Sequence, residues 1–89
     1  MISRRHPHFK RDFARLPKQV QQQAREAYRR FKCDPQHPGI EFKKLHTAQP
    51  LWSVRINDSY RAVGVRDGEK VIWFFIGTHA QYDQILRNL

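Results

Sequence analysis

The sequence predicts an α+β fold: a small, twisted antiparallel β-sheet of three to four strands, packed on an N-terminal α-helical hairpin and followed by a short C-terminal helix. Three observations support this class. Two apolar stripes at helical spacing come first, two alternating segments follow, and a β-branched and aromatic run leads into a helix-capping sequence. The 89 residues are expected to form one domain, 1–89, with one modest core.

Two amphipathic helices are expected ahead of the sheet, arranged as an antiparallel hairpin. Phe9, Phe13 and Leu16 are spaced i, i+4 and i+7, which indicates a first helix of about two or three turns. Pro17 suits the first position of a second helix, whose outer face is basic. The inner face of this second helix carries the apolar stripe Val20, Ala24, Ala27, Tyr28 and Phe31. Before both helices, Ile2–Arg5 is either a brief edge strand or a disordered arm.

Three strands are expected in the second half of the chain. Leu51–Asn57 alternates apolar and polar residues, and Tyr60–Arg66 resumes the sheet after a turn-forming segment at 57–59. Val71–Ile76 is an unbroken run of β-branched and aromatic residues, which is typical of a strand buried on both faces. The Asp-Gly pair at 67–68 predicts a two-residue hairpin turn between the last two strands.

The two turns define an expected register. The two-residue loop places Arg66 opposite Glu69, and a three-residue loop at 57–59 places Arg55 opposite Arg61. One face of the sheet is then almost wholly apolar and should pack on the helices; it comprises Trp52, Val54, Ile56, Tyr60, Ala62, Gly64, Val71, Trp73 and Phe75. The other face comprises Ser53, Arg55, Arg61, Val63, Val65, Ile72, Phe74 and Ile76.

A helix start is expected directly after the last strand. Gly77 interrupts the apolar run, and Thr78 and Gln81 have the spacing of a capping box. Helical spacing then continues through Tyr82, Ile85, Leu86 and Leu89. His79 falls in the first turn, where unpaired backbone N–H groups favour anions and disfavour a charged imidazole. A neutral His79 could act as a general base, or it is simply a polar residue at a helix start.

Arg55, Arg61 and His79 are expected to converge at one end of the sheet. Like charges opposed across a ladder cost up to about 1 kcal/mol, so an anion is expected between the two arginines. That anion is a substrate phosphate or a carboxylate such as Asp58 or Asp83; alternatively, the arginines point into water. If the anion is a substrate phosphate, Arg55, Arg61 and His79 form a basic site that binds it.

The chain is strongly basic, with 17 Lys and Arg against 8 Asp and Glu and a formal net charge of +9. This balance favours a polyanionic partner, either nucleic acid, an anionic membrane surface or an acidic protein. A membrane is the least favoured, because no apolar run has spanning length and the N-terminal residues lack a signal-peptide core. The single Cys33 and the lack of a Cys/His cluster at ligand spacing predict no internal disulfide and no zinc site, and a cytoplasmic protein fits these features.

Four short elements carry a family resemblance; they are Lys44-Leu45, Val54-Arg55-Ile56, Tyr60-Arg61 and Ile76-Gly77-x-His79 with Tyr82 nearby. With the expected order of helices and strands, they resemble the RelE/ParE superfamily of bacterial toxin–antitoxin toxins, with the RelE and YafQ branch favoured. The resemblance covers roughly Phe9 to Leu86, and its most specific parts are the Tyr-Arg and Ile-Gly-x-His elements.

The resemblance implies a partner and an activity. The partner is a cognate antitoxin protein that wraps the toxin and covers its basic groove. In the RelE, YafQ and HigB branches the activity is metal-free cleavage of mRNA in the ribosomal A site, which inhibits translation. The RNA 2′-OH attacks its own phosphate and gives a cyclic phosphate and a 5′-OH, so no cofactor is implied.

The resemblance also implies roles for single residues. Arg61 matches the catalytic arginine of RelE, and Arg55 matches a basic residue on the preceding strand, whereas Ser53 stands where RelE has a second lysine. His79 matches the catalytic histidine of the YafQ branch and is the implied base. Tyr82 would orient RNA, stack on a base or relay a proton, although the family's late aromatic residue stands further on. Contacts to the RNA backbone are expected from Lys43, Lys44 and His46.

Two other functions stay open. The ParE branch shares the fold, lacks the RNase residues and poisons DNA gyrase, which would make this chain a non-enzymatic inhibitor. A degenerate, non-toxic relative would bind only an antitoxin or nucleic acid. Cleaved mRNA, DNA damage with intact mRNA, or unaffected growth on expression without antitoxin would separate the three functions.

Overall fold

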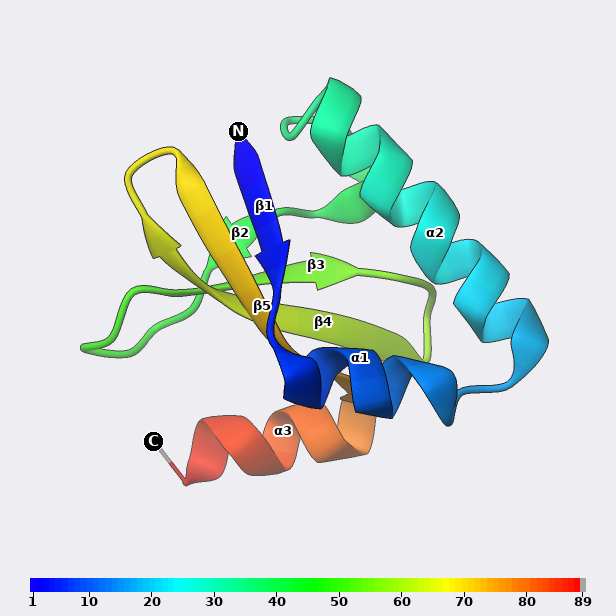
Figure 1. Cartoon of the computed structure of the whole chain (residues 1–89). Helices are drawn as coiled ribbons and strands as arrows, with labels where there is room; N and C mark the ends of the chain where they lie inside the picture. Colours follow the sequence, from blue (N-terminus) through cyan, green and yellow to red (C-terminus); the bar gives the residue numbers. More distant parts are fainter. Residues whose placement is uncertain (89) are drawn as a thin grey trace.

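A mixed β-sheet organises the fold (Figure 1). The computed structural model describes residues 1–88, and within them it has five strands, three α-helices and one 3₁₀ turn. The strands are β1 (Ile2–Arg5), β2 (Lys43–Lys44), β3 (Leu51–Arg55), β4 (Tyr60–Asp67) and β5 (Lys70–Thr78). The helices are α1 (Pro7–Ala14), α2 (Lys18–Cys33) and α3 (His79–Arg87), and the 3₁₀ turn is η1 (Pro38–Ile40).

The α+β class is confirmed, and the sheet is larger than predicted. Its order is β1-β5-β4-β3-β2, in which β1 runs parallel to β5 and the other neighbours are antiparallel. The segment left open between an edge strand and a disordered arm is therefore a strand. The indole N–H of Trp73 donates to Ser3 Oγ at 2.8 Å and ties β1 to β5. Hairpin signals cannot reveal such a parallel pair, because its strands are joined by a long crossover.

The two N-terminal helices cover one face of the sheet and open as a V from their junction at Pro17 (Figure 1). The side-chain amide of Gln21 on α2 donates to carbonyl oxygens at the end of α1 and just beyond it, with distances of 3.2 Å to Phe13 O and 3.1 Å to Leu16 O. These bonds tie the end of α1 to the start of α2. No helix within residues 1–88 combines the length and the apolarity that crossing a membrane requires.

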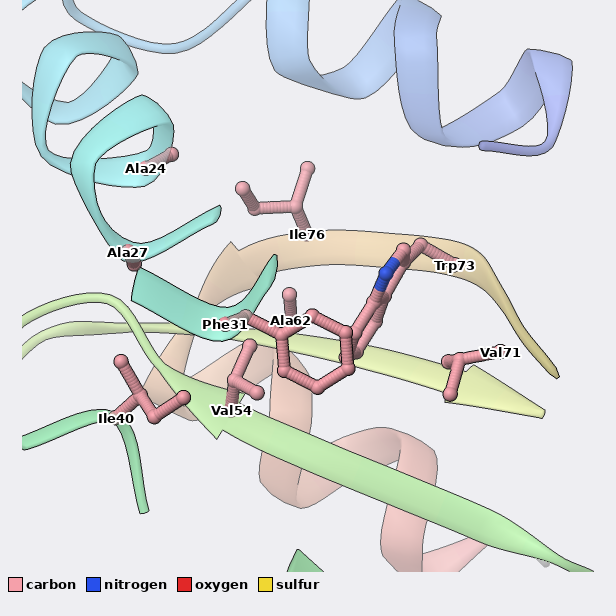
Figure 2. Close-up of a cluster of buried hydrophobic side chains, with 9 residues drawn as sticks. All are labelled: Ala24, Ala27, Phe31, Ile40, Val54, Ala62, Val71, Trp73 and Ile76. Atoms are coloured by element: carbon pink, nitrogen blue, oxygen red, sulfur yellow. The ribbon is translucent and has the colours of Figure 1, made fainter. Parts of the chain in front are cut away.

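The larger core fills the space between these helices and the sheet; its buried members are Ala24, Ala27, Phe31, Ile40, Val54, Ala62, Val71, Trp73 and Ile76 (Figure 2). The Phe31 ring meets Phe42 and Trp73 edge-on, at centroid distances of 4.9 and 5.4 Å. A second buried cluster on the opposite face comprises Leu45, Leu51, Val63 and Tyr82. Leu86 of α3 packs at its margin, and the predicted helical position Leu89 lies outside the described residues.

The β4–β5 hairpin differs from the predicted register. Asp67 pairs with Lys70, so the loop consists of Gly68 and the following glutamate, and Arg66 faces Val71 instead of that glutamate. Gly68 has a φ of 59°. The loop needs a positive φ at one position, and glycine adopts this conformation without strain. Gly68 therefore occupies that position, and Asp67 stays in the strand.

A β-bulge then exchanges the two faces near the end of β5. Gly64 pairs with Trp73 but Val63 pairs with Phe75, which leaves one extra residue on β5. Phe75, predicted on the helix face, therefore packs against the second cluster, and Ile76, predicted on the other face, joins the larger core. A Cβ on Gly64 would lie 2.9 Å from a backbone carbonyl oxygen of β5, so glycine permits the close approach at the bulge.

Candidate functional site

The β3–β4 turn and the start of α3 meet at one corner of the molecule. At the end of the β4–β5 ladder, Tyr60 pairs with Thr78 and Arg61 pairs with Gly77. Beyond the ladder, the backbone N–H of His79 donates to the carbonyl of Ser59 at 2.7 Å. The structure thus brings the backbones of Arg61 and His79 together, and we refer to this region as the Arg61–His79 corner.

The capping box predicted at the start of α3 is present. Thr78 Oγ1 accepts from the N–H of Gln81 at 3.2 Å, and Gln81 Oε1 accepts from the N–H of Thr78 at 2.9 Å. β5 continues through Gly77 without the predicted interruption, and α3 begins directly at His79. A Cβ on Gly77 would collide with Gln81 Oε1. Glycine here leaves room for the capping side chain of Gln81 and for the Phe75 ring, and its φ is not positive.

The start of α3 is not the open anion site that was predicted. The N–H of His79 is bonded to the β3–β4 turn, and the N–H of Gln81 is bonded to the Thr78 hydroxyl. Two of the donors that a helix start usually leaves free are thus satisfied within the chain. Positive charge at the Arg61–His79 corner must therefore come mainly from side chains.

Arg55 and Arg61 face each other across β3 and β4, as predicted, but their partners differ. Arg55 forms an ion pair with Asp58, and its Nε lies 3.5 Å from Glu41 Oε2. Arg61 Nη1 donates to the backbone carbonyl of Asn57 in the β3–β4 connection and, at 3.0 Å, to that of Tyr60 at the start of β4. No carboxylate within residues 1–88 pairs with Arg61. The prediction that a carboxylate pairs with the arginines is therefore correct for Arg55 only. Within residues 1–88 the charge of Arg61 is not balanced by a carboxylate.

Glu41 is a site residue that the sequence analysis missed. It follows η1 with a φ of 45°, in the left-handed region that residues with a Cβ seldom adopt. In that conformation its carboxylate approaches Arg55 from a different element of the fold. The only local signal was the glycine-containing turn before it, which does not indicate where the carboxylate points.

His79 is accessible and lies beside an acid. Its Nε2 is 3.6 Å from Asp83 Oδ1, one turn further along α3, and the two side chains are 49% and 50% exposed. Asp83 was considered as a partner for the arginines and lies beside the histidine instead. At this distance the carboxylate and the imidazole are close enough to interact electrostatically but are not hydrogen-bonded.

Tyr82 lies beneath the surface and not at it. Only 6% of the residue is exposed, and it packs in the second cluster with Leu45, Leu51 and Val63. Its ring centroid is 5.6 Å from that of His79. With so little of it exposed, the ring does not stand out beside His79 as an outer stacking platform, and it packs next to the imidazole.

The three predicted RNA-contacting residues are exposed at the β2 edge of the sheet; they are Lys43, Lys44 and His46. Lys43 pairs with Ser53, which is 1% exposed. Paired residues share a sheet face, and Arg55 lies two positions beyond Ser53 on β3, so Lys43 is on the same face as both arginines. Ser53 stands where RelE has a lysine, and Lys43 of the edge strand β2 lies directly beside it.

Comparison with known proteins gives a consistent result. A family model described as a ParE-like toxin domain matches residues 18–84. The structure is similar to YafQ from E. coli (TM-score 0.72, 9% identity, covering 90% of this chain and 94% of that one). It also matches a RelB–RelE antitoxin–toxin complex from Methanococcus jannaschii (TM-score 0.74, 11% identity, 92% and 96%) and the isolated E. coli RelE toxin (0.67, 16%, 99% and 98%). No curated protein matches the sequence significantly, and identities this low show a shared fold.

Proposed function

The chain belongs to the ParE-like toxin domain family, and from this premise we propose that it is the toxin of a toxin–antitoxin system and a ribosome-dependent mRNA endonuclease. The observation that carries the proposal is the Arg61–His79 corner. There an arginine with no carboxylate partner in residues 1–88 pairs through its backbone with Gly77, two residues before an accessible histidine that has an acid at 3.6 Å. A base beside a fixed positive charge is what cleavage of RNA through its 2′-OH needs.

In the proposed reaction, His79 removes the proton from the 2′-OH, and the 2′-oxygen forms a bond to the adjacent phosphorus. The bond from phosphorus to the 5′-oxygen breaks, and that oxygen takes a proton from the imidazolium or from water. Arg61 stabilises the negative charge that accumulates on the phosphorane, with a planar and permanently charged group. Arg55 contributes once RNA displaces its exposed partner Asp58.

The proposed partners are mRNA and an acidic antitoxin, and both follow from the charge of +9. Lys43, Lys44 and His46 are proposed to contact the RNA backbone. An antitoxin that covered Arg61 would block the corner by supplying the carboxylate that this arginine lacks. The M. jannaschii structure is a complex of an antitoxin with a toxin of this fold, which supports the same kind of pairing. Since translated mRNA is the proposed substrate, the proposed location is the cytoplasm.

The test is expression without antitoxin, followed by primer extension on a translated mRNA. The wild-type chain should arrest growth and produce new 5′ ends in phase with codons, whereas His79→Ala should produce none. His8→Ala is the matched control, because His8 is an exposed histidine at the start of α1 and should leave cleavage unchanged. Growth arrest with intact mRNA for both wild type and His79→Ala would refute the endonuclease.

Inhibition of DNA gyrase is the second candidate, and two observations favour it. The matching family model is described as ParE-like, and the burial of Tyr82 leaves the set of RNase residues incomplete at the surface. A gyrase inhibitor would induce DNA damage while translated mRNA stays whole. Normal growth during expression would instead identify a non-toxic relative that only binds an antitoxin or nucleic acid.

A further inference from the structure

A hollow of about 200 Å³ lies between the loop after β2 and α3. One side is formed by residues 43–47, and the other by Tyr82 and Leu86. In Figure 1 this loop extends on the same side of the sheet as α3. His79 and Arg61 are not among the lining residues, so the hollow is distinct from the Arg61–His79 corner.

The lining combines two kinds of surface. Leu45 and Tyr82 are buried and Leu86 is half-buried, which makes an apolar floor. Lys43, Lys44 and His46 are exposed and form the rim, and the two lysines are cationic. Proteins recognise single-stranded RNA by packing an unstacked base against aromatic or apolar side chains while cations hold the backbone phosphates. The hollow has both parts of that arrangement.

The size of the hollow favours one base over a segment of protein. Pockets for drug-sized ligands have about 300–1,000 Å³, and this hollow is smaller. An amphipathic helix docks through several side chains along a long apolar groove, which needs more room and no cationic rim. A single nucleotide needs one apolar slot and a positive charge for its phosphate.

The hollow adjoins the proposed reaction centre on two sides. Tyr82 lines the hollow, and its ring centroid lies 5.6 Å from that of His79. Lys43 shares its sheet face with Arg55 and Arg61. An RNA strand whose scissile phosphate lay at the Arg61–His79 corner would therefore have a neighbouring nucleotide within reach of the hollow.

We propose that this hollow binds one unpaired nucleobase beside the scissile phosphate, with Lys43 holding the phosphate of that nucleotide, and so sets the base preference of cleavage. The inference rests on the proposed endonuclease activity. It gives Tyr82 a role in base recognition, as part of the floor of the hollow, in place of proton transfer.

The first test is binding, which does not depend on cleavage. The full-length His79→Ala chain, labelled with ¹⁵N, is titrated with each of the four ribonucleoside 3′-monophosphates and with inorganic phosphate. Amide shifts in residues 43–47 and 82–86 that differ between bases and are not produced by phosphate support the proposal. Shifts that are the same for all four bases and for phosphate, or that are confined to the Arg61–His79 corner, overturn it.

The second test compares cleavage patterns. Leu86→Trp fills the hollow and His46→Ala removes a rim group, while Arg87→Ala changes a neighbouring exposed residue outside the lining. We expect the base preference at one position beside the cut to weaken by about tenfold in the first two variants and to stay unchanged in the third. Circular dichroism checks that each variant is folded. If Leu86→Trp does not fold, His46→Ala still provides the test.

The outcomes separate this inference from the function on which it rests. Cleavage with an unchanged base pattern in both hollow variants overturns the base site and leaves the endonuclease intact. Base-dependent shifts without any mRNA cleavage leave the base site supported and refute the endonuclease. If an antitoxin shifts the amides of residues 43–47 and no nucleotide does, the hollow is a protein-docking site and the inference is wrong.

Discussion

Arg55 and Arg61 lie directly opposite each other on β3 and β4, yet within residues 1–88 only Arg55 has carboxylate partners. The like-charge repulsion across the ladder is therefore relieved on one side only. To bind a phosphate, Arg55 must give up a carboxylate partner, Asp58 or Glu41. Arg61 has no carboxylate to give up. The two arginines should contribute unequally to any function that involves a phosphate or an acidic partner.

Arg61→Ala should reduce mRNA cleavage more than Arg55→Ala does. Removing one group that stabilises transition-state charge costs about 10²- to 10³-fold in rate, and we expect this range for Arg61. For Arg55 we expect about tenfold, because Asp58 and Glu41 already occupy its guanidinium. Initial rates of purified toxin on translated mRNA provide the measurement, with thermal melting as the control for folding. Equal losses would contradict the asymmetry.

Asp58→Asn should increase affinity for single-stranded RNA, because it removes an anion that competes for Arg55. Exposed ion pairs contribute at most about 1 kcal/mol, so the gain should not exceed about fivefold. Fluorescence anisotropy at low salt measures it. Asp12→Asn is the matched control, since Asp12 lies near Arg11 on α1 and its removal changes the net charge equally. The same gain in both variants would show an effect of net charge alone.

His79→Ala should reduce cleavage by about 10²- to 10⁴-fold, the usual contribution of a general base. Asp83→Asn should reduce it by no more than about fivefold, because the pair is half-exposed and its atoms are 3.6 Å apart. Single-turnover cleavage rates compare the two variants. A loss in Asp83→Asn as large as that in His79→Ala would mean that the carboxylate takes part directly in proton transfer.

Thr78→Ala should lower the free energy of unfolding by about 1 kcal/mol, because it removes the hydroxyl that caps α3. Thr78→Ser keeps that hydroxyl and should stay within a few tenths of a kcal/mol of wild type. Urea denaturation followed by circular dichroism measures both variants. If the two lose equal stability, the methyl group and not the hydrogen bond is responsible.

Gly64→Ala should lower the free energy of unfolding by about 1–3 kcal/mol, the usual cost of overpacking. The added Cβ would lie 2.7 Å from Val71 Cγ1 and 2.9 Å from Ile72 O, and the backbone oxygen cannot move away freely. Gly68→Asn is a contrasting change, because nothing lies within 4 Å of a Cβ there and asparagine tolerates a positive φ. A milder effect at Gly64 than at Gly68 would show that the bulge can relax.

The sequence alone predicted what depends on local patterns. The amphipathic stripe of α2 and the alternation of β3 and β4 arise from neighbours in the chain, as does the Thr78–Gln81 capping box. The three-residue turn at 57–59 also predicts Arg55 opposite Arg61, and the structure confirms this pairing. These features follow from repeats of about 3.6 and 2 residues and from turn chemistry, all of which are visible in a short window.

Tertiary structure decided the features that depend on distant segments. β1 joins the sheet in parallel, the bulge at Gly64 exchanges Phe75 and Ile76, and Glu41 reaches Arg55 from outside the sheet. The partners of Arg55 and the burial of the Tyr82 ring depend on which segments lie close in space, and spacing along the sequence does not specify this. The sequence therefore determined which residues gather at the Arg61–His79 corner, and the fold determined that Arg61 keeps its charge free while Tyr82 is covered.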